Sequence, residues 1–213
     1  MTFQKNKYLV IRKVISRPLA KFITQYFLLK RKVTRRLFDE RYISQFTTEF
    51  GVWDDEQVPQ TYSHYADIAM ETLLTWVQPA MEAHTGLKLS PTYSYARIYK
   101  KGDVLKRHKD RFSCEISTTL NLGGDAWPLY LEPSGKENMK GIKVDLKPGD
   151  MLIYSGCELE HWREAFQGED CIQVFLHYNK ADSKKAKENE FDTRSHLGLP
   201  SWFKNAQLPS PKK

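Results

Sequence analysis

The second half of the chain is a succession of short β-rich runs separated by turns. Gly-Gly-Asp, Pro-Ser-Gly and Pro-Gly-Asp sequences lie between several of these runs, which are Thr92–Tyr99, Glu115–Leu122, Leu129–Glu132, Gly141–Leu146, Asp150–Tyr154 and Cys171–Tyr178. Many short strands at this spacing are typical of a β-sandwich or a β-barrel. This part of the sequence therefore predicts a mainly β core.

The first 90 residues predict a strand and two helices. Tyr8–Ile15 is strand-like, and Ser16 can cap a helix that has Pro18 in its first turn. Apolar residues then recur at intervals of three and four, which indicates a helix packed on a sheet: Leu19, Phe22, Ile23, Tyr26 and Leu29. A second helix is predicted from Ser63 to about Thr85, where Gly86 ends it. Residues 40–59 are polar and predict a loop.

These patterns together predict one α+β domain that is mainly β. Residues 1–90 would support the core, residues 91–180 would form it, and residues 181–213 would be a C-terminal extension with a loose end at Pro209–Lys213. The length of 213 residues and the hydrophobic content of 40% suit a single substantial core.

Composition also bears on the location of the protein. No apolar run approaches the roughly 18 residues of a membrane span, and the N-terminal residues do not resemble a secretory signal. The three cysteines, Cys114, Cys157 and Cys171, are odd in number and form no Cys-x-x-Cys motif. They predict reduced thiols rather than a disulfide framework or a zinc site, and hence a cytoplasmic protein.

The positive charge of the chain is concentrated at its N-terminal end. The formal net charge is +7, and residues 1–36 contain basic residues but no Asp or Glu. The eleven basic residues are Lys5, Lys7, Arg12, Lys13, Arg17, Lys21, Lys30, Arg31, Lys32, Arg35 and Arg36. A solvated basic helix face accounts for them, and contact with nucleic-acid phosphate is the alternative.

One group of residues indicates metal chemistry. His108 and Asp110 are two positions apart in a polar turn after a strand-like run, and His161 follows 51 positions after Asp110, beyond a Pro-Gly-Asp turn and another strand. Residues i and i+2 of an extended segment face the same way, and a facing strand can supply the third ligand. Two imidazoles and one carboxylate on one face of a metal suit iron(II) in oxygen-activating enzymes. A solvated turn that binds nothing is the alternative.

From about Tyr93 to Asn179 the sequence resembles the catalytic domain of the iron(II)- and 2-oxoglutarate-dependent oxygenases, in their prolyl-4-hydroxylase-like branch. The resemblance is carried by Arg97-Ile98-Tyr99, Gly102, His108-Lys109-Asp110, Ser117–Leu122, Lys147–Tyr154, His161 and Phe175-Leu176-His177-Tyr178. It implies a double-stranded β-helix (jelly roll) with His108, Asp110 and His161 as the iron ligands. It also implies that 2-oxoglutarate and O2 are consumed, a C–H bond is hydroxylated, and succinate and CO2 are released.

The same resemblance raises the question of which residue binds the C5 carboxylate of 2-oxoglutarate. The family usually uses a Lys or Arg shortly after the second His, but the corresponding positions here, Asp170 to Ile172, hold no cation. Arg163 is the nearest cation, and it is either this anchor or the partner of Glu160 or Glu164 in a surface ion pair.

Other residues have open roles near the predicted site. Tyr99 and Thr119 match positions that contact the co-substrate, and Gln173 and His177 face the cavity if odd positions of the last strand point inward. Arg111 pairs with the Asp110 carboxylate or with the substrate, or it forms a structural pair with Glu115. Three aromatic residues wall the substrate side or belong to the core: Trp127, Tyr130 and Trp162.

The favoured function is hydroxylation of a C–H bond, in a peptidyl proline or another amino-acid side chain. A non-catalytic jelly-roll binding module is the second hypothesis, because the late-strand cation is missing. A nucleic-acid-modifying oxygenase is the third, because residues 1–36 are basic. The sequence predicts a peptide or amino-acid partner and no membrane, and it leaves the oligomeric state open.

Overall fold

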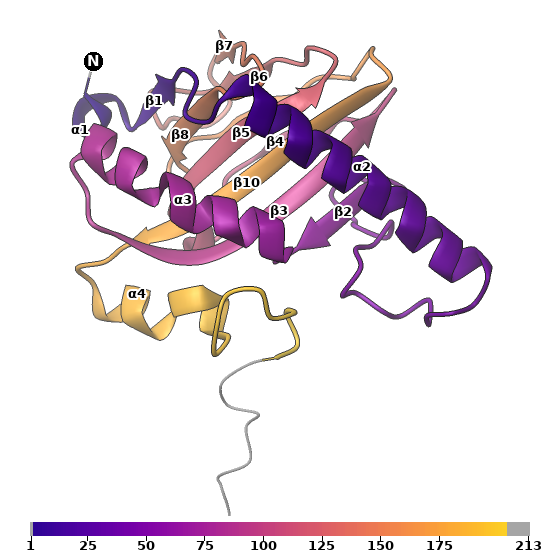
Figure 1. Ribbon diagram of the computed structural model, residues 1–213. Helices are drawn as coiled ribbons and strands as arrows, with labels where there is room; N and C mark the ends of the chain where they lie inside the picture. Colours follow the sequence, from indigo (N-terminus) through magenta and orange to yellow (C-terminus); the bar gives the residue numbers. More distant parts are fainter. Residues whose placement is uncertain (1, 204–213) are drawn as a thin grey trace, which may run out of the picture.

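A computed structural model describes residues 2–203 as two antiparallel sheets with helices on one outer face (Figure 1). The larger sheet has the order β1-β8-β5-β10-β3-β2, with bounds Tyr8–Ile11, Met151–Ser155, Ile116–Gly124, Asp170–Lys180, Leu89–Lys100 and Tyr62–Tyr65. The smaller sheet has the order β4-β9-β6-β7, with bounds Leu105–His108, His161–Arg163, Leu129–Leu131 and Ile142–Val144. The predicted mainly β jelly-roll core with supporting helices is confirmed.

Three of the α-helices that the structure describes precede the long strand β3, and the fourth follows the last strand, β10. They are α1 (Phe3–Asn6), α2 (Arg17–Asp39), α3 (Ile68–Thr85) and α4 (Lys184–Glu188), with single 3-10 turns at Phe112–Cys114 and Glu190–Thr193. Figure 1 shows α2 and α3 crossing the same face of the larger sheet, with α4 near one end of it. No helix within residues 2–203 is long and apolar enough to cross a membrane.

The alternation of side chains along the strands divides the interior into two parts. Even-numbered residues of β3 and β10, such as Ala96 and Val174, are buried in an apolar cluster with Phe27 of α2 and Leu74 of α3. Successive strand residues point to opposite faces, so the odd-numbered residues turn toward the smaller sheet. Those odd residues are polar or aromatic, and they line a cavity: Tyr93, Tyr95, Arg97, Tyr99, Phe175 and His177.

The beginnings of the two long helices follow from their capping residues. Ser16 caps α2 as predicted, because its hydroxyl accepts a hydrogen bond from the Leu19 N–H. The predicted start of the second helix at Ser63 is wrong. Residues 62–65 are strand β2, which pairs with β3, and α3 begins after Asp67, whose carboxylate accepts bonds from two N–H groups of the first turn. Tyr-Ser-His-Tyr suits a pleated strand, and Asp is a strong N-cap.

The predicted apolar stripe of α2 is only partly buried. Ile23 packs in the core, whereas Phe22 and Leu29 are 68% and 62% exposed. The sequence period identified the helix correctly, but it could not say which part of the apolar arc meets the sheet.

The segment after β10 is tied to the domain by a buried ion pair. Arg194 donates to both carboxylate oxygens of Glu71 in α3, and the two side chains are 0% and 2% exposed. Arg194 also donates to the backbone carbonyl of Thr92 in β3. Residues 181–203 are therefore held against α3 and β3, while the predicted loose end at residues 209–213 lies outside the described residues.

We expect Arg194→Ala to reduce the free energy of unfolding by about 3–5 kcal/mol, because it leaves the Glu71 carboxylate buried without a cation. Urea unfolding followed by circular dichroism measures the change. Lys184→Ala is the matched control, since Lys184 pairs with Glu188 on the surface and its loss should have an effect below about 1 kcal/mol. Equal effects of the two substitutions would contradict the prediction.

Candidate active site

A cavity of about 380 Å³ opens between the two sheets. Strands β3 and β10 of the larger sheet form one wall, and β4 and β9 of the smaller sheet contribute Leu105, His108 and His161 to the other. Asp55 and Gln57, from the loop between α2 and β2, also reach it. This volume lies near the lower end of the range for small-molecule sites.

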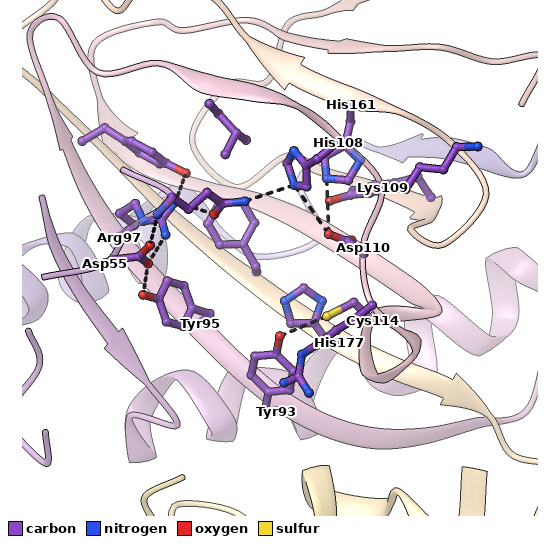
Figure 2. Close-up of a pocket in the computed structure, with 16 residues that line it drawn as sticks. Asp55, Tyr93, Tyr95, Arg97, His108, Lys109, Asp110, Cys114, His161 and His177 are labelled. Carbon is purple, nitrogen blue, oxygen red and sulfur yellow. Dashed lines mark hydrogen bonds and ion pairs between the residues drawn. The ribbon is translucent and has the colours of Figure 1, made fainter. Parts of the chain in front are cut away.

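His108, Asp110 and His161 meet on one side of this cavity (Figure 2). The Asp110 Oδ1 atom lies 3.7 Å from His108 Nε2 and 3.5 Å from His161 Nε2. The ligand atoms of the three residues all lie within 4.8 Å of one another, which lets them contact one divalent ion. The structure therefore brings together the three residues that the sequence singled out.

Strand pairing brings the two histidines together. His108 is the last residue of β4 and lies directly opposite His161, the first residue of β9. The two rings are 4.2 Å apart between centroids. Neither short strand was predicted from the sequence, because three or four residues carry too little periodicity to be recognised.

Backbone carbonyls orient both imidazoles. His108 Nδ1 lies 2.7 Å from the Lys106 carbonyl oxygen, and His161 Nδ1 lies 3.2 Å from that of Leu159. A carbonyl can only accept, so each Nδ1 carries a proton, and the Nε2 atom of the neutral ring then presents its lone pair to the cavity. This arrangement is the usual support for a metal-binding histidine.

The carboxylate is held by the segment around it. The Asp110 N–H donates to the Gly156 carbonyl, and the Ser117 hydroxyl donates to Asp110 Oδ2 at 2.7 Å. A Cβ atom on Gly156 would lie 2.4 Å from Asp110 Oδ2, so only glycine permits this approach. Burial alone would raise the pKa of Asp110, but His161 and the Ser117 hydrogen bond hold it well below its usual value. Asp110 is therefore an anion at neutral pH.

Protonation of two neighbouring histidines is disfavoured. Burial lowers the pKa of His108, and a proton on His161 would lower it further. Burial also lowers the pKa of His177 to about 4. His177 lines the cavity, as the odd-position alternation predicted, and its Nδ1 is 3.1 Å from the Ser117 hydroxyl.

A second polar group is buried beside the cavity, around Arg163. The Arg163 side chain is 1% exposed and donates to the Trp127 carbonyl oxygen, and its Nε has no hydrogen-bond partner among residues 2–203. Burial lowers the pKa of Arg163, and the ionisable groups that interact with it are Cys171, Tyr99 and Tyr154, none of them a carboxylate. The alternative of a surface ion pair with Glu160 or Glu164 is wrong, since Arg163 is buried, Glu164 is exposed and Glu160 pairs with Arg107.

The other predicted co-substrate residues lie at different depths. Tyr99 lines the cavity, whereas Thr119 and Gln173 are buried outside its wall. The Gln173 amide donates to Cys171 Sγ at 3.2 Å, and its carbonyl oxygen has no partner among residues 2–203. Thr119 interacts with Tyr154, which lines the cavity and interacts with Arg163. Tyr99, Thr119 and Gln173 are thus linked to Arg163 either directly or through one neighbouring side chain.

Two further predictions on side-chain roles need correction. Arg111 pairs with Asp192 rather than with Glu115, and its guanidinium lies on the cavity rim. Tyr130 and Trp162 stack on each other with 5.6 Å between centroids and do not line the cavity. Trp127 packs against Tyr99 in a buried cluster, so it belongs to the core.

Sequence reasoning missed Asp55, Gln57 and the site role of Arg97. Arg97 is 2% exposed and donates to the Asp55 carboxylate and, at 3.1 Å, to the Gln57 carbonyl oxygen (Figure 2). Asp55 and Gln57 lie in a polar loop without a periodic pattern. The only available signal was Arg97 itself, a charged residue on the odd face of a strand that is otherwise aromatic.

Several cations of the basic N-terminal segment pair with acidic side chains of the domain. Five of its eleven cations form ion pairs with acidic residues: Lys7 with Glu158, Arg12 with Asp150, Lys30 with Asp67, Arg31 with Asp170 and Arg36 with Glu40. The clustering of charge along the sequence therefore overstates the cationic surface available to a polyanion.

Comparison with solved structures finds this fold in proteins of distant sequence. A prolyl-4-hydroxylase from Pseudomonas putida has a TM-score of 0.58 at 15% identity, with 84% of this chain and 95% of that chain covered. HygX from Streptomyces hygroscopicus, with nickel, 2-oxoglutarate and hygromycin B bound, has 0.59 at 15%, covering 84% and 85%. A prolyl hydroxylase from Trichoplax adhaerens, in complex with a hypoxia inducible factor peptide fragment, has 0.59 at 16%, covering 84% and 86%.

The chain has their fold. The resemblance to 2-oxoglutarate-dependent oxygenases that the sequence predicted is thus confirmed at the level of architecture. A scan against protein-family models gave no match, and a search of curated proteins gave none either.

We expect the stability of the metal-free protein to fall as the pH is lowered from about 6.5 to 4. The pKa of His177 is about 4 in the folded chain and about 6.5 in the unfolded chain. As the pH falls, the unfolded chain therefore takes up the proton before the folded chain does. The stabilisation is complete above pH 6.5 and decreases by roughly 3 kcal/mol by pH 4. Urea unfolding at several pH values measures the slope. His177→Gln should reduce this slope, and an unchanged slope would contradict the assignment.

Proposed function

We propose that this protein is an iron(II)- and 2-oxoglutarate-dependent dioxygenase that hydroxylates a C–H bond of an amino acid or an amino-acid residue. The observation that carries the proposal is that a group of possible metal ligands and a buried arginine lie close together. His108, Asp110 and His161 present two imidazoles and a carboxylate to the cavity. Two residues beyond His161 lies Arg163, a buried arginine that has no carboxylate partner in the part of the chain that the structure describes.

The donor set fits iron(II). Two neutral imidazoles and one ionised carboxylate, with no thiolate, form the facial arrangement that leaves positions open for other ligands. Bound iron with 2-oxoglutarate supplies the activation of O2 that oxidation of an unactivated C–H bond requires. The chain contributes two imidazoles whose Nδ1 protons are held by backbone carbonyls, so that Nε2 can bind the metal. It also contributes the ionised Asp110 and the Ser117 hydrogen bond that orients this carboxylate.

The surroundings of Arg163 fit the far carboxylate of 2-oxoglutarate. Residues two apart on a strand point the same way and are separated by roughly 7 Å, so Arg163 projects from the same face of β9 as His161. A dicarboxylate of five carbons spans a comparable length. A buried guanidinium without an anion is unfavourable, and a bidentate carboxylate would satisfy its free Nε–H together with an Nη–H. Thr119, Gln173 and Tyr99 would supply the remaining polar contacts.

The preference for an amino-acid substrate rests on structural likeness and on the walls of the cavity. A relative in fold binds a peptide fragment and another binds hygromycin B, so the fold alone does not select a substrate. Tyr93, Tyr95 and Phe175 give the cavity aromatic walls, and Arg97 gives it a cation. Such a lining suits a compact molecule that is partly apolar and partly charged.

We expect His108→Ala and Asp110→Ala each to weaken divalent-metal binding by more than about 100-fold while the fold is retained. Loss of a residue that only hydrogen-bonds to a metal ligand weakens binding by up to about 100-fold, and loss of a ligand itself should weaken it more. Isothermal titration with Co(II) under nitrogen measures the affinity, and circular dichroism checks the fold. His84→Ala is the matched control, because His84 is exposed on α3 and does not line the cavity. Unchanged affinity in either site variant would exclude this metal centre.

We expect Arg163→Gln to weaken 2-oxoglutarate binding by about 30-fold or more, since it removes the cation from a buried charge pair, and to leave metal affinity within about twofold. Anaerobic titration of the Fe(II)-loaded protein, followed by the visible charge-transfer band, measures both. Arg36→Gln is the control, because Arg36 pairs with Glu40 on the exposed surface at the end of α2. Metal binding without any band in the unaltered protein would favour a non-catalytic binding module instead.

A further inference from the structure

The loop between α2 and β2 sends two side chains into the cavity that the proposed function assigns to the substrate. Asp55 and Gln57 line the cavity next to the metal-binding residues. The loop is anchored close by, because Val58 is 2% exposed and packs with Tyr99 and Leu105 in the cluster beside the cavity. The two polar side chains are therefore held over the site by an adjacent buried residue.

Gln57 contacts the atom that a metal would need. The Gln57 Nε2 amide lies 3.2 Å from His108 Nε2, and the His108 Nδ1 proton is directed at the Lys106 carbonyl. His108 Nε2 is therefore the acceptor, and Gln57 donates to the lone pair that faces Asp110 and His161. A metal ion and Gln57 cannot share this lone pair, so metal binding requires the amide to move.

Arg97 is the cation that holds both loop side chains. Its guanidinium donates to the Asp55 carboxylate, to the Gln57 carbonyl oxygen at 3.1 Å and to the Tyr99 hydroxyl at 3.2 Å. Its Nε has no hydrogen-bond partner among the residues that the structure describes. Burial alone would raise the pKa of Asp55, but Arg97 and Tyr95 lower it below its usual value, so the pair is ionised. The cavity thus contains a buried arginine already occupied by a carboxylate and an amide of the chain itself.

The two buried arginines, Arg97 and Arg163, differ in whether the chain itself supplies a carboxylate partner. Arg163 has no carboxylate partner within residues 2–203, whereas Arg97 has Asp55. A single Gln57 side-chain amide bridges Arg97 and His108, so Arg97 lies only one amide group away from a metal ligand. A molecule whose carboxylate replaced Asp55 would present carbon atoms a few bonds away to the metal.

We propose that Asp55 and Gln57 occupy the place of the substrate, and that the substrate carries a carboxylate that displaces Asp55 from Arg97. This inference rests on the proposed function and narrows its substrate to a small carboxylic acid of amino-acid type. Arg97 is then the residue that determines specificity, and residues 55–57 act as an internal competitor that leaves when metal and substrate bind.

The first test concerns Gln57. Gln57→Ala should bind Co(II) about twofold to tenfold more tightly than the unaltered protein, because one neutral hydrogen bond no longer has to be broken. Gln45→Ala, an exposed glutamine of the same loop, is the matched control and should leave the affinity unchanged. Equal affinity in Gln57→Ala and the unaltered protein would show that Gln57 does not compete with the metal.

The second test concerns the carboxylate. Free L-amino acids and the corresponding L-amino-acid amides are offered to the protein loaded with Co(II) and 2-oxoglutarate, and binding is measured by ligand-observed NMR. We expect at least one acid to bind about 30-fold more tightly than its amide, as expected for loss of one partner in a buried charge pair. Acetyl-aspartate amide and acetyl-glutamate amide form a third series, which separates a peptide side-chain carboxylate from that of a free amino acid.

Variants separate recognition from folding. Asp55→Asn keeps the shape and removes the competing charge, so it should strengthen binding of the acid several-fold. Arg97→Lys keeps the charge but loses the planar fork, so it should weaken binding of the acid about tenfold in the protein already loaded with Co(II) and 2-oxoglutarate. Arg107→Lys alters an arginine–carboxylate pair outside the cavity and serves as the control. Thermal unfolding of each variant checks the fold.

The outcomes distinguish this inference from the proposed function. If Co(II) and 2-oxoglutarate bind but amides bind as well as acids, or no series binds, or Asp55→Asn has no effect, the role of Arg97 is overturned and the dioxygenase proposal stands. If Co(II) or 2-oxoglutarate fails to bind to the unaltered protein, the dioxygenase proposal itself fails.

Discussion

The structure depends on the two-residue alternation of the long strands β3, β5 and β10. Their even positions supply the apolar surface against which α2 and α3 pack, and this burial holds the larger sheet together. Their odd positions carry arginine, serine, threonine, glutamine and histidine into the interior. Burying such groups is unfavourable unless each finds a partner, so this face cannot serve as an ordinary core. The same pleat that builds the domain therefore also creates a polar cavity.

The partners of these buried groups are arranged in two layers. Backbone carbonyls and the Ser117 hydroxyl orient His108, His161 and Asp110, and strand pairing fixes the distance between the two histidines. Around Arg163 the arrangement is incomplete, since a guanidinium nitrogen and the Gln173 carbonyl oxygen have no partner within residues 2–203. Native proteins satisfy nearly all buried polar groups, so the groups around Arg163 that lack a partner are consistent with the proposed binding of a small polar molecule beside His108, Asp110 and His161.

Charge is distributed unevenly between the two arginines of the interior. Arg97 is neutralised by Asp55, a residue of a surface loop, whereas Arg163 is surrounded by tyrosines, cysteine and tryptophan. A loop can move at lower free-energy cost than a strand of the core, because fewer buried contacts hold it. The position of Asp55 therefore makes the Arg97 site exchangeable, while the Arg163 site has a rigid frame. This difference is the physical basis for assigning the two arginines to two different carboxylates.

The sequence by itself determined the features that depend on local pattern. Alternating runs and turn residues predicted a mainly β sandwich or barrel, and the spacing of His108, Asp110 and His161 predicted the three residues that meet at the cavity, because strand periodicity and i, i+2 geometry are local. The jelly-roll arrangement of the strands came from the resemblance to the oxygenases. It could not find the short strands β2, β4 and β9, and it placed the start of the second helix too early. Only the tertiary structure decided that Arg163 is buried, that Arg111 pairs with Asp192 and that Asp55 and Gln57 reach Arg97. Those outcomes depend on packing between segments far apart in the chain, which no local pattern encodes.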